Sequence, residues 1–292
     1  MEWSVRVRIR VHTSETLRNS FPEASVAGTS HSGVRSERRK GFEMKLSKRE
    51  VQVRGHRVRY EVAGEGEPVV LVHGLSGSSR WWARNVPSLA EHYRVHLVDL
   101  PGFGTMRHLR RHFSLVEAAS WLSAWMDAVR LPQAHLVGHS MGGYVCLRLA
   151  ASRPQSVRRL VLAAPAGVPT GRSMPGHLIP LLGAAYLATP SFLPVLLRDA
   201  LRMGPITLWR AARDLLAEDV RQDLHSIKAP TLLVWGENDP LVPPAVGTVM
   251  REEIPDSRLL VLKGAAHVPM FDRPDEFNAA LVGFFAGYSV GE

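Results

Sequence analysis

The stretch LVGHSMGGY, residues 136–144, constrains this chain more than any other part of it. It contains the pattern G-x-S-x-G around Ser140, which a chain of 292 residues should hold by chance only roughly 0.1 times. An apolar strand pattern at 134–137 leads into it, and a helical pattern at 144–151 leads out. The glycines leave room for a strained serine backbone. The stretch therefore predicts a strand–turn–helix that presents a nucleophilic serine above a sheet edge.

A serine hydroxyl is a weak nucleophile unless a base and an orienting acid assist it. Asp239, in WGENDPLVP, comes just after an apolar strand pattern at 231–235, and His267 comes just after another at 259–262. We expect His267 to accept the Ser140 proton and Asp239 to orient the imidazole. Glu237 is a rival carboxylate two residues from Asp239, and Asp272 reads as a helix N-cap or loop residue.

An oxyanion hole needs two backbone N–H groups. We expect one from Met141, directly after the serine, and one from Leu75 in the loop VHGLSGSS, with Ser76 as the alternative donor. His73 comes at the start of the loop VHGLSGSS, and His139 lies inside the serine turn. We expect both histidines to make structural hydrogen bonds.

Strand and helix patterns alternate along the chain, which predicts an α/β fold with a doubly wound, mostly parallel sheet. Two alternating strands begin at Arg49, and Ser114–Glu117 has the S-x-x-E form of a capping box, followed by a stripe of apolar residues at helical spacing. Further strands are expected at 68–72, 94–100, 134–139, 157–163, 231–235 and 258–262, and further helices at 140–151, 244–253 and 274–287.

The chain divides into three parts by composition. Residues 1–43 are rich in Arg, Ser and Glu and predict a disordered extension or a start upstream of the native one. Residues 44–167 and 229–292 form the predicted core, and 168–228 interrupt the alternation with an apolar, proline-broken stretch that predicts a helical lid. Four prolines in its uncharged part, 173–197, argue against one membrane-spanning helix.

Five motifs in order resemble the α/β-hydrolase superfamily, in its single-domain, lidded esterase, lactonase and carbon–carbon hydrolase branch. They are VHG (72–74), DLPGFG (99–104), GHSMGG (138–143), the WGENDP acid loop and the GAAHVP histidine loop. The resemblance covers about residues 49–167 and 229–290, and it implies an acyl-serine mechanism, no cofactor and a variable lid that selects the substrate. Relatives often carry a serine soon after DLPGFG, where this chain has Thr105. Ser140 argues against the epoxide hydrolases and haloalkane dehalogenases, which use a nucleophilic aspartate.

We therefore expect a serine hydrolase that cleaves carboxylic esters with small to medium apolar acyl groups. The same triad could instead serve a lactonase, a carbon–carbon bond hydrolase, an acyltransferase or a monoacylglycerol-type lipid hydrolase; a non-catalytic binding protein of this fold is a further alternative. Side chains expected to line the substrate pocket are Ser76, Trp81, Leu182, Leu187, Phe192, Val242 and Val268.

The composition of the chain limits the classes of partner that it is expected to bind. The formal net charge is +9, but the arginines are scattered and no nucleic-acid-binding motif accompanies them, so a small-molecule ester is the expected partner and nucleic acid is not. We expect the basic segment 106–113 to be a solvated loop. The alternative is that its charge attracts an acidic substrate or an anionic membrane surface. The single cysteine, Cys146, permits neither an internal disulfide nor a cysteine metal site. With no signal peptide apparent at the start, we expect a soluble, cytoplasmic protein that uses no metal; its oligomeric state stays open.

Overall fold

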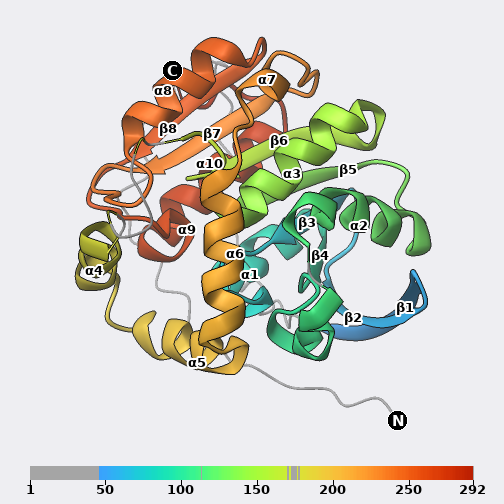
Figure 1. Ribbon diagram of the computed structural model, residues 1–292. Helices are drawn as coiled ribbons and strands as arrows, with labels where there is room; N and C mark the ends of the chain where they lie inside the picture. Colours follow the sequence, from blue (N-terminus) through green and yellow to red (C-terminus); the bar gives the residue numbers. More distant parts are fainter. Residues whose placement is uncertain (1–45, 113, 170, 172–175, 177, 292) are drawn as a thin grey trace, which may run out of the picture.

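An eight-stranded sheet forms the centre of the molecule, as the computed structural model shows (Figure 1). The structure describes residues 46–112, 114–169, 171, 176 and 178–291, so the predicted extension at 1–43 lies outside the described residues. The strands are β1 (Ser47–Val53), β2 (His56–Ala63), β3 (Pro68–Val72), β4 (Arg94–Val98), β5 (Ala134–His139), β6 (Val157–Ala163), β7 (Thr231–Gly236) and β8 (Ser257–Leu262).

The strand order β1-β2-β4-β3-β5-β6-β7-β8 places the start of the nucleophile motif at the middle of the sheet. β4, β3, β5, β6, β7 and β8 are parallel, whereas β1 and β2 are antiparallel to their neighbours. The chain moves from β3 outward to β4 and then returns to β5 on the other side of β3. This reversal is a topological switch point, where open α/β sheets form their ligand crevices. The predicted fold class is confirmed.

Helices cover both faces of the sheet because its central strands are apolar on both sides. Alternate residues of β3 pack into different cores: Val70 and Val72 into one, Val69 and Leu71 into the other. The first core lies under α2 (Leu115–Ala128), α3 (Met141–Ser152) and α8 (Pro244–Glu253), and the second under α1 (Val86–Ala90) and α10 (Pro274–Phe285). The short helix α9 (Pro269–Asp272) precedes α10.

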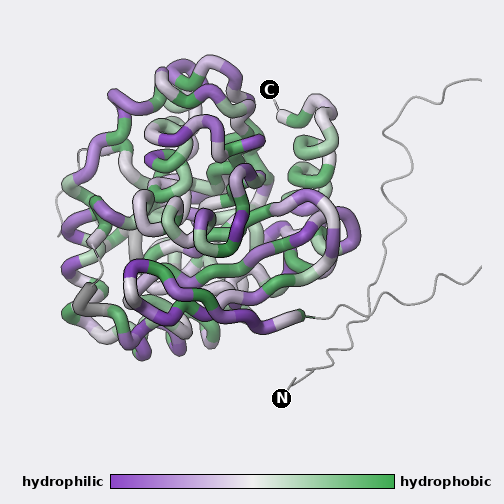
Figure 2. Tube along the Cα trace, turned by 90° about the vertical axis from the view of Figure 1, so that its right-hand side faces the viewer, coloured by the Kyte–Doolittle hydropathy of each residue, from purple (hydrophilic) through white to green (hydrophobic). Residues whose placement is uncertain are grey.

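One edge of the sheet is strand β8, and the other edge is strand β1, which lies on the side that faces the viewer in Figure 2. Its outward residues include Lys48, Arg49 and Glu50, all exposed. Charges on an edge strand oppose pairing with a strand of another molecule. The strand begins at Ser47, two residues before the predicted Arg49.

Two local predictions were wrong. Ser114 occupies the N-cap of α2, but its side chain makes no capping hydrogen bond, so the capping box does not form. The basic segment predicted as a solvated loop belongs mostly to a 3-10 helix, η3 (Gly104–His112), because Met106 and Leu109 are buried in the core beneath it. Arg107 on the same helix is exposed.

Among the described residues between β6 and β7, where the lid was expected, lie four α-helices. They are α4 (Leu178–Leu187), α5 (Leu193–Met203), α6 (Pro205–Ala217) and α7 (Arg221–Leu224). In Figure 1, α4 and α5 lie at the left and bottom, and α6 crosses the front of the molecule. None of the helices in the described ranges is both long and apolar enough to span a membrane.

Candidate active site

Ser140 sits on a sharp turn between β5 and α3, as the motif predicts. Its backbone has φ 50° and ψ −115°, a conformation that non-glycine residues rarely adopt. The Ser140 N–H donates to the carbonyl oxygen of Ala163 at 2.9 Å, and its own carbonyl accepts from the N–H groups of Tyr144 and Ala166. These bonds to β6, α3 and the following loop hold the strained turn in place.

The glycines on either side of Ser140 are required by close backbone approach. A Cβ at Gly138 would lie 2.3 Å from the carbonyl oxygen of Gly142. A Cβ at Gly142 would lie 2.3 Å from the carbonyl oxygen of Val72 on β3. A side chain at Gly138 would collide with the first turn of α3, and one at Gly142 would push that turn away from β3 and from the loop that follows β3.

The structure brings Ser140, His267 and Asp239 together in one hydrogen-bonded line. His267 Nε2 lies 3.1 Å from Ser140 Oγ, and His267 Nδ1 lies 2.8 Å from Asp239 Oδ2. Because a carboxylate can only accept, Nδ1 carries the proton and Nε2 is left as the acceptor for the serine hydroxyl. This is the tautomer that a general base needs. Ser140 and Asp239 are buried, and the imidazole is only slightly exposed.

Asp239 is fixed by its own loop. Its Oδ1 accepts from the backbone N–H groups of Leu241 at 2.9 Å and Val242 at 3.0 Å, which leaves Oδ2 for the histidine. The indole N–H of Trp235, at the end of β7, donates to the Val242 carbonyl and ties the same loop to the sheet. The rival carboxylate Glu237 instead accepts from the Gly264 N–H and takes no part in the line.

The loop after β3 abuts the serine because β3 and β5 are parallel neighbours. A Cβ at Gly74 would lie 3.3 Å from Ser140 Cβ, and Ser76 turns the chain with φ 61°. Leu75 lies between these two residues, and Met141 is the first residue of α3. Both predicted oxyanion donors therefore flank the serine in adjoining turns.

His73 fixes this loop, as its expected structural role implies. Its Nδ1 donates to the Gly74 carbonyl at 2.9 Å, and its Nε2 accepts from the Leu100 N–H at 3.1 Å. Burial lowers the pKa of the His73 imidazole, which keeps the ring neutral and able to accept.

Two further residues support His267, and sequence patterns gave no sign of these contacts. His139 Nε2 donates to the His267 carbonyl at 2.7 Å, and burial lowers the pKa of His139 well below its ordinary value. Asp272, expected to be an N-cap or loop residue, ends α9; it accepts from the Ala266 N–H at 3.0 Å and from the Thr189 hydroxyl at 2.6 Å. It thus links the histidine loop to the segment before α5. Only a contact between segments distant in sequence could reveal either role.

Asp99, in the motif DLPGFG, organises the neighbouring turn. Its carboxylate accepts from the backbone N–H groups of Ser79 and Thr105, both at 2.7 Å, and from the Thr105 hydroxyl at 2.8 Å. Thr105 thereby supplies a hydroxyl close to where relatives often carry a serine.

The residues expected to line the pocket lie in different environments. Trp81 and Phe192 are buried against each other with ring centroids 5.0 Å apart, and the Trp81 ring is also 5.6 Å from that of His139. Leu182 and Leu187 are exposed on α4. Ser76, Val242 and Val268 lie in the loops around the triad, on the three turns described above.

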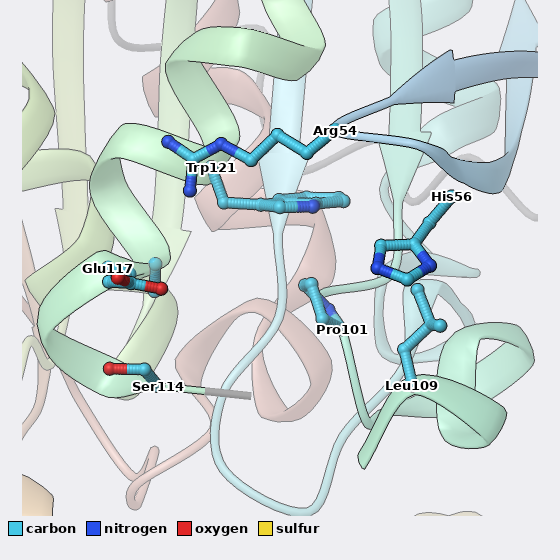
Figure 3. Close-up of a pocket in the computed structure, with 8 residues that line it drawn as sticks. Arg54, His56, Pro101, Leu109, Ser114, Glu117 and Trp121 are labelled. Carbon is cyan, nitrogen blue, oxygen red and sulfur yellow. The ribbon is translucent and has the colours of Figure 1, made fainter. Parts of the chain in front are cut away.

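A cavity of about 310 Å³ lies elsewhere, between the β1–β2 turn, η3 and the start of α2 (Figure 3). Arg54, Trp121, His56 and Leu109 line it, and none of the predicted pocket residues does. Within the described part of the chain, no group of three His, Cys, Asp or Glu side chains could hold a metal ion.

Comparison with known proteins places the chain among hydrolases. It is 33% identical over 249 residues to the pimeloyl-[acyl-carrier protein] methyl ester esterase of Aeromonas hydrophila, an alignment that covers 75% of this chain and 96% of that protein. It is 32% identical over 260 residues to the 2-hydroxy-6-oxo-6-phenylhexa-2,4-dienoate hydrolase of Comamonas testosteroni, covering 78% and 90%.

A solved structure with the same fold is that of Est816, described as an N-acyl homoserine lactone degrading enzyme. It superposes with a TM-score of 0.73 at 27% identity and covers 81% of this chain and 100% of that one. Residues 69–280 match the alpha/beta hydrolase family. The chain therefore belongs to the alpha/beta hydrolase family.

Proposed function

We propose that this hydrolase cleaves carboxylic esters through an acyl-serine intermediate on Ser140. The observation that carries the proposal is the line from Ser140 Oγ through His267 to Asp239, with the His267 tautomer fixed by the carboxylate. The methyl ester esterase named above supports an ester as the substrate, and the buried pair of Trp81 and Phe192 beside His139 supports small to medium apolar acyl groups.

The mechanism follows from the positions of these groups. His267 Nε2 takes the proton of the Ser140 hydroxyl as Oγ attacks the ester carbonyl, and Asp239 stabilises the imidazolium that forms. The N–H groups of Met141 and Leu75 would hold the oxyanion, and the N-terminus of α3 favours negative charge there. His267 then protonates the leaving alcohol. Water, deprotonated by the same imidazole, releases the acid.

The helices between β6 and β7 act in this proposal as a lid that selects the substrate. The inserted segment contacts the chain after β3, after β7 and after β8: Asp199 of α5 accepts from the Ser78 hydroxyl at 2.7 Å, Gly183 of α4 packs beside Pro240, and Thr189, between α4 and α5, donates to Asp272. A lid bound to these three parts of the site can pass differences in substrate shape to the catalytic groups.

The test is hydrolysis of a p-nitrophenyl acylate by the wild type and by Ser140→Ala. We expect the variant to lose activity while folding normally, since it removes one oxygen atom. A fluorophosphonate probe should label Ser140, and labelling should fall sharply in His267→Ala. Activity retained by Ser140→Ala would refute the proposed nucleophile.

A carbon–carbon hydrolase or lactonase is the second candidate, favoured by the dienoate hydrolase and by Est816. An acyl-chain-length series of p-nitrophenyl esters, run beside lactones and a diketone acid, separates the candidates. Higher kcat/KM on the diketone acid than on every ester would overturn the ester proposal and leave the role of Ser140 intact.

A further inference from the structure

Helix α5 presents an apolar stripe to solvent. Leu193, Leu197 and Leu201 recur every four residues and are exposed, with Leu197 at 61% and Leu201 at 73%. The opposite side of the helix is buried through Asp199 and Met203. We call the side that carries the three leucines the outer face of α5. Exposed apolar stripes of this kind mark contact surfaces.

Further exposed apolar side chains lie on the two helices next to α5 in the chain. Ile206 and Trp209 are exposed on α6, directly after α5 in the chain. Ile179, Leu182 and Tyr186 are exposed on α4, which precedes it. One helical insertion therefore carries most of the large exposed apolar side chains in the described part of the molecule.

Positive charge accompanies the stripe. Arg198 and Arg202 lie next to Leu197 and Leu201 on the exposed side, and Arg80 is close enough that its charge is the largest cause lowering the pKa of the Arg198 guanidinium. η3 packs against α5 and adds the exposed Arg107. No carboxylate among the described residues forms an ion pair with any of these four arginines.

The carboxylates closest to this cluster do not neutralise its outward side. Asp199 is buried and engaged by Ser78, and Asp99 is buried and engaged by Ser79 and Thr105. Glu61, near Arg80, is half-buried, and desolvation raises the pKa of its carboxyl group. The outer face of α5 is therefore both apolar and cationic.

The positive charge of the outer face of α5 limits which partner can bind there. A second copy of the chain docked face to face would oppose arginine to arginine. Residues 1–45 carry nine Lys and Arg against five Glu, so they too would be repelled. An anionic lipid surface complements both features, because leucines enter the headgroup boundary while arginines meet lipid phosphates.

We propose that the outer face of α5 docks this protein on an anionic lipid bilayer. The inner side of the same helix reaches the active site: Asp199 holds Ser78 just after the oxyanion loop, and Phe192, at the N-cap of α5, packs on Trp81. Docking would bring this side of the molecule to the membrane. Because the inference concerns membrane binding, it can be tested independently of the reaction proposed for Ser140.

The test is flotation of the full-length Ser140→Ala protein with vesicles of phosphatidylcholine alone or with phosphatidylglycerol added. The inactive background keeps the lipids unchanged, and hydrolysis assays on wild type test the reaction separately. We expect binding to the anionic vesicles that weakens with salt. Arg198→Glu with Arg202→Glu should weaken it at least about 30-fold, since each basic residue near an anionic surface contributes about fivefold.

Leu197→Glu with Leu201→Glu should weaken binding about 100-fold or more, because two leucine side chains are no longer transferred from water into the bilayer. The matched controls are Val116→Glu, at a site 67% exposed on α2, and Lys228→Glu, an exposed cation between α7 and β7 that belongs to none of the helices α4, α5 and α6. Both controls should bind like the parent, and thermal unfolding should show that every variant is folded.

Three outcomes would overturn the inference. One is absence of binding to anionic vesicles at low salt. Another is retained binding in the leucine variant together with its loss when Arg6, Arg8 and Arg10 are changed to Glu, which would assign the contact to residues 1–45. The third is a concentration-dependent dimer that Leu197→Glu dissociates, which would identify a second copy as the occupant.

Discussion

Replacing Asp239 by Asn tests the proposed triad most sharply, because the structure dictates how the new amide must point. Asp239 Oδ1 accepts from two backbone N–H groups, those of Leu241 and Val242. An amide keeps those two bonds only through its oxygen, so its NH₂ group must face His267 Nδ1. The imidazole then has to accept at Nδ1 and carry its proton on Nε2.

In that tautomer His267 cannot take the proton of Ser140. Where the same wrong tautomer has been imposed on a serine hydrolase, kcat falls about 10⁴-fold, which corresponds to about 5.4 kcal/mol in the activation free energy. KM should change little, because Asp239 is buried and away from substrate. The free energy of unfolding should change by only about 1 kcal/mol, since every hydrogen bond of residue 239 keeps a partner.

The assay is steady-state hydrolysis of a p-nitrophenyl ester, with fluorophosphonate labelling of Ser140 and thermal unfolding run beside it. Glu237→Gln is the matched control, since Glu237 accepts only from the Gly264 N–H. It should keep kcat within about threefold. An Asp239→Asn enzyme within tenfold of wild type, or a larger loss in Glu237→Gln, would show that the acid has been misassigned.

Three further predictions concern the support of the site and the stability of the fold. Gly138→Ala places a Cβ 2.3 Å from the Gly142 carbonyl oxygen and should lower the free energy of unfolding by about 2 kcal/mol, measured by urea denaturation; an unchanged midpoint would contradict the steric argument. Asp272→Ala should lower kcat about 10- to 100-fold by releasing the Ala266 N–H next to the catalytic histidine, whereas Asp272→Asn should restore most of it, because an amide accepts from an N–H and donates to a hydroxyl. Burial lowers the pKa of His96 from 6.5 to about 4. Between these pH values the unfolded chain therefore binds one more proton at His96 than the folded protein does. The free energy of unfolding should fall by about 1.4 kcal/mol for each pH unit of acidification in this range. His96→Phe should flatten that part of the curve of unfolding free energy against pH, and an identical curve would count against the shift.

The patterns that predicted correctly are the local ones. The buried strand at 68–72, the elbow around Ser140 and the apolar stripe of α2 depend on residues close together in sequence, and each appears in the structure. The prediction of a capping box was wrong because the Ser114 side chain makes no capping hydrogen bond. The prediction of a solvated loop was wrong because two apolar residues of η3 enter the core.

The contacts that position the candidate site could not be predicted in the same way. Asp272 meets Thr189 across 83 residues, and His139 meets His267 across 128. Neither pair has a spacing or composition that distinguishes it from other polar residues in loops. The contact between Phe192 and Trp81 likewise joins segments far apart in the sequence, and their expected place in the substrate pocket stays a prediction.

The sequence by itself determined the elbow, the order of Ser140, Asp239 and His267, and the alternation that makes a parallel sheet, because each of these depends on local sterics or on where a strand ends. Only the tertiary structure decided which oxygen of Asp239 faces the histidine, which residues brace the histidine loop and which leucines of α5 stay in water. Those outcomes depend on side chains that meet only after the sheet has closed and the inserted helices have packed over its edge.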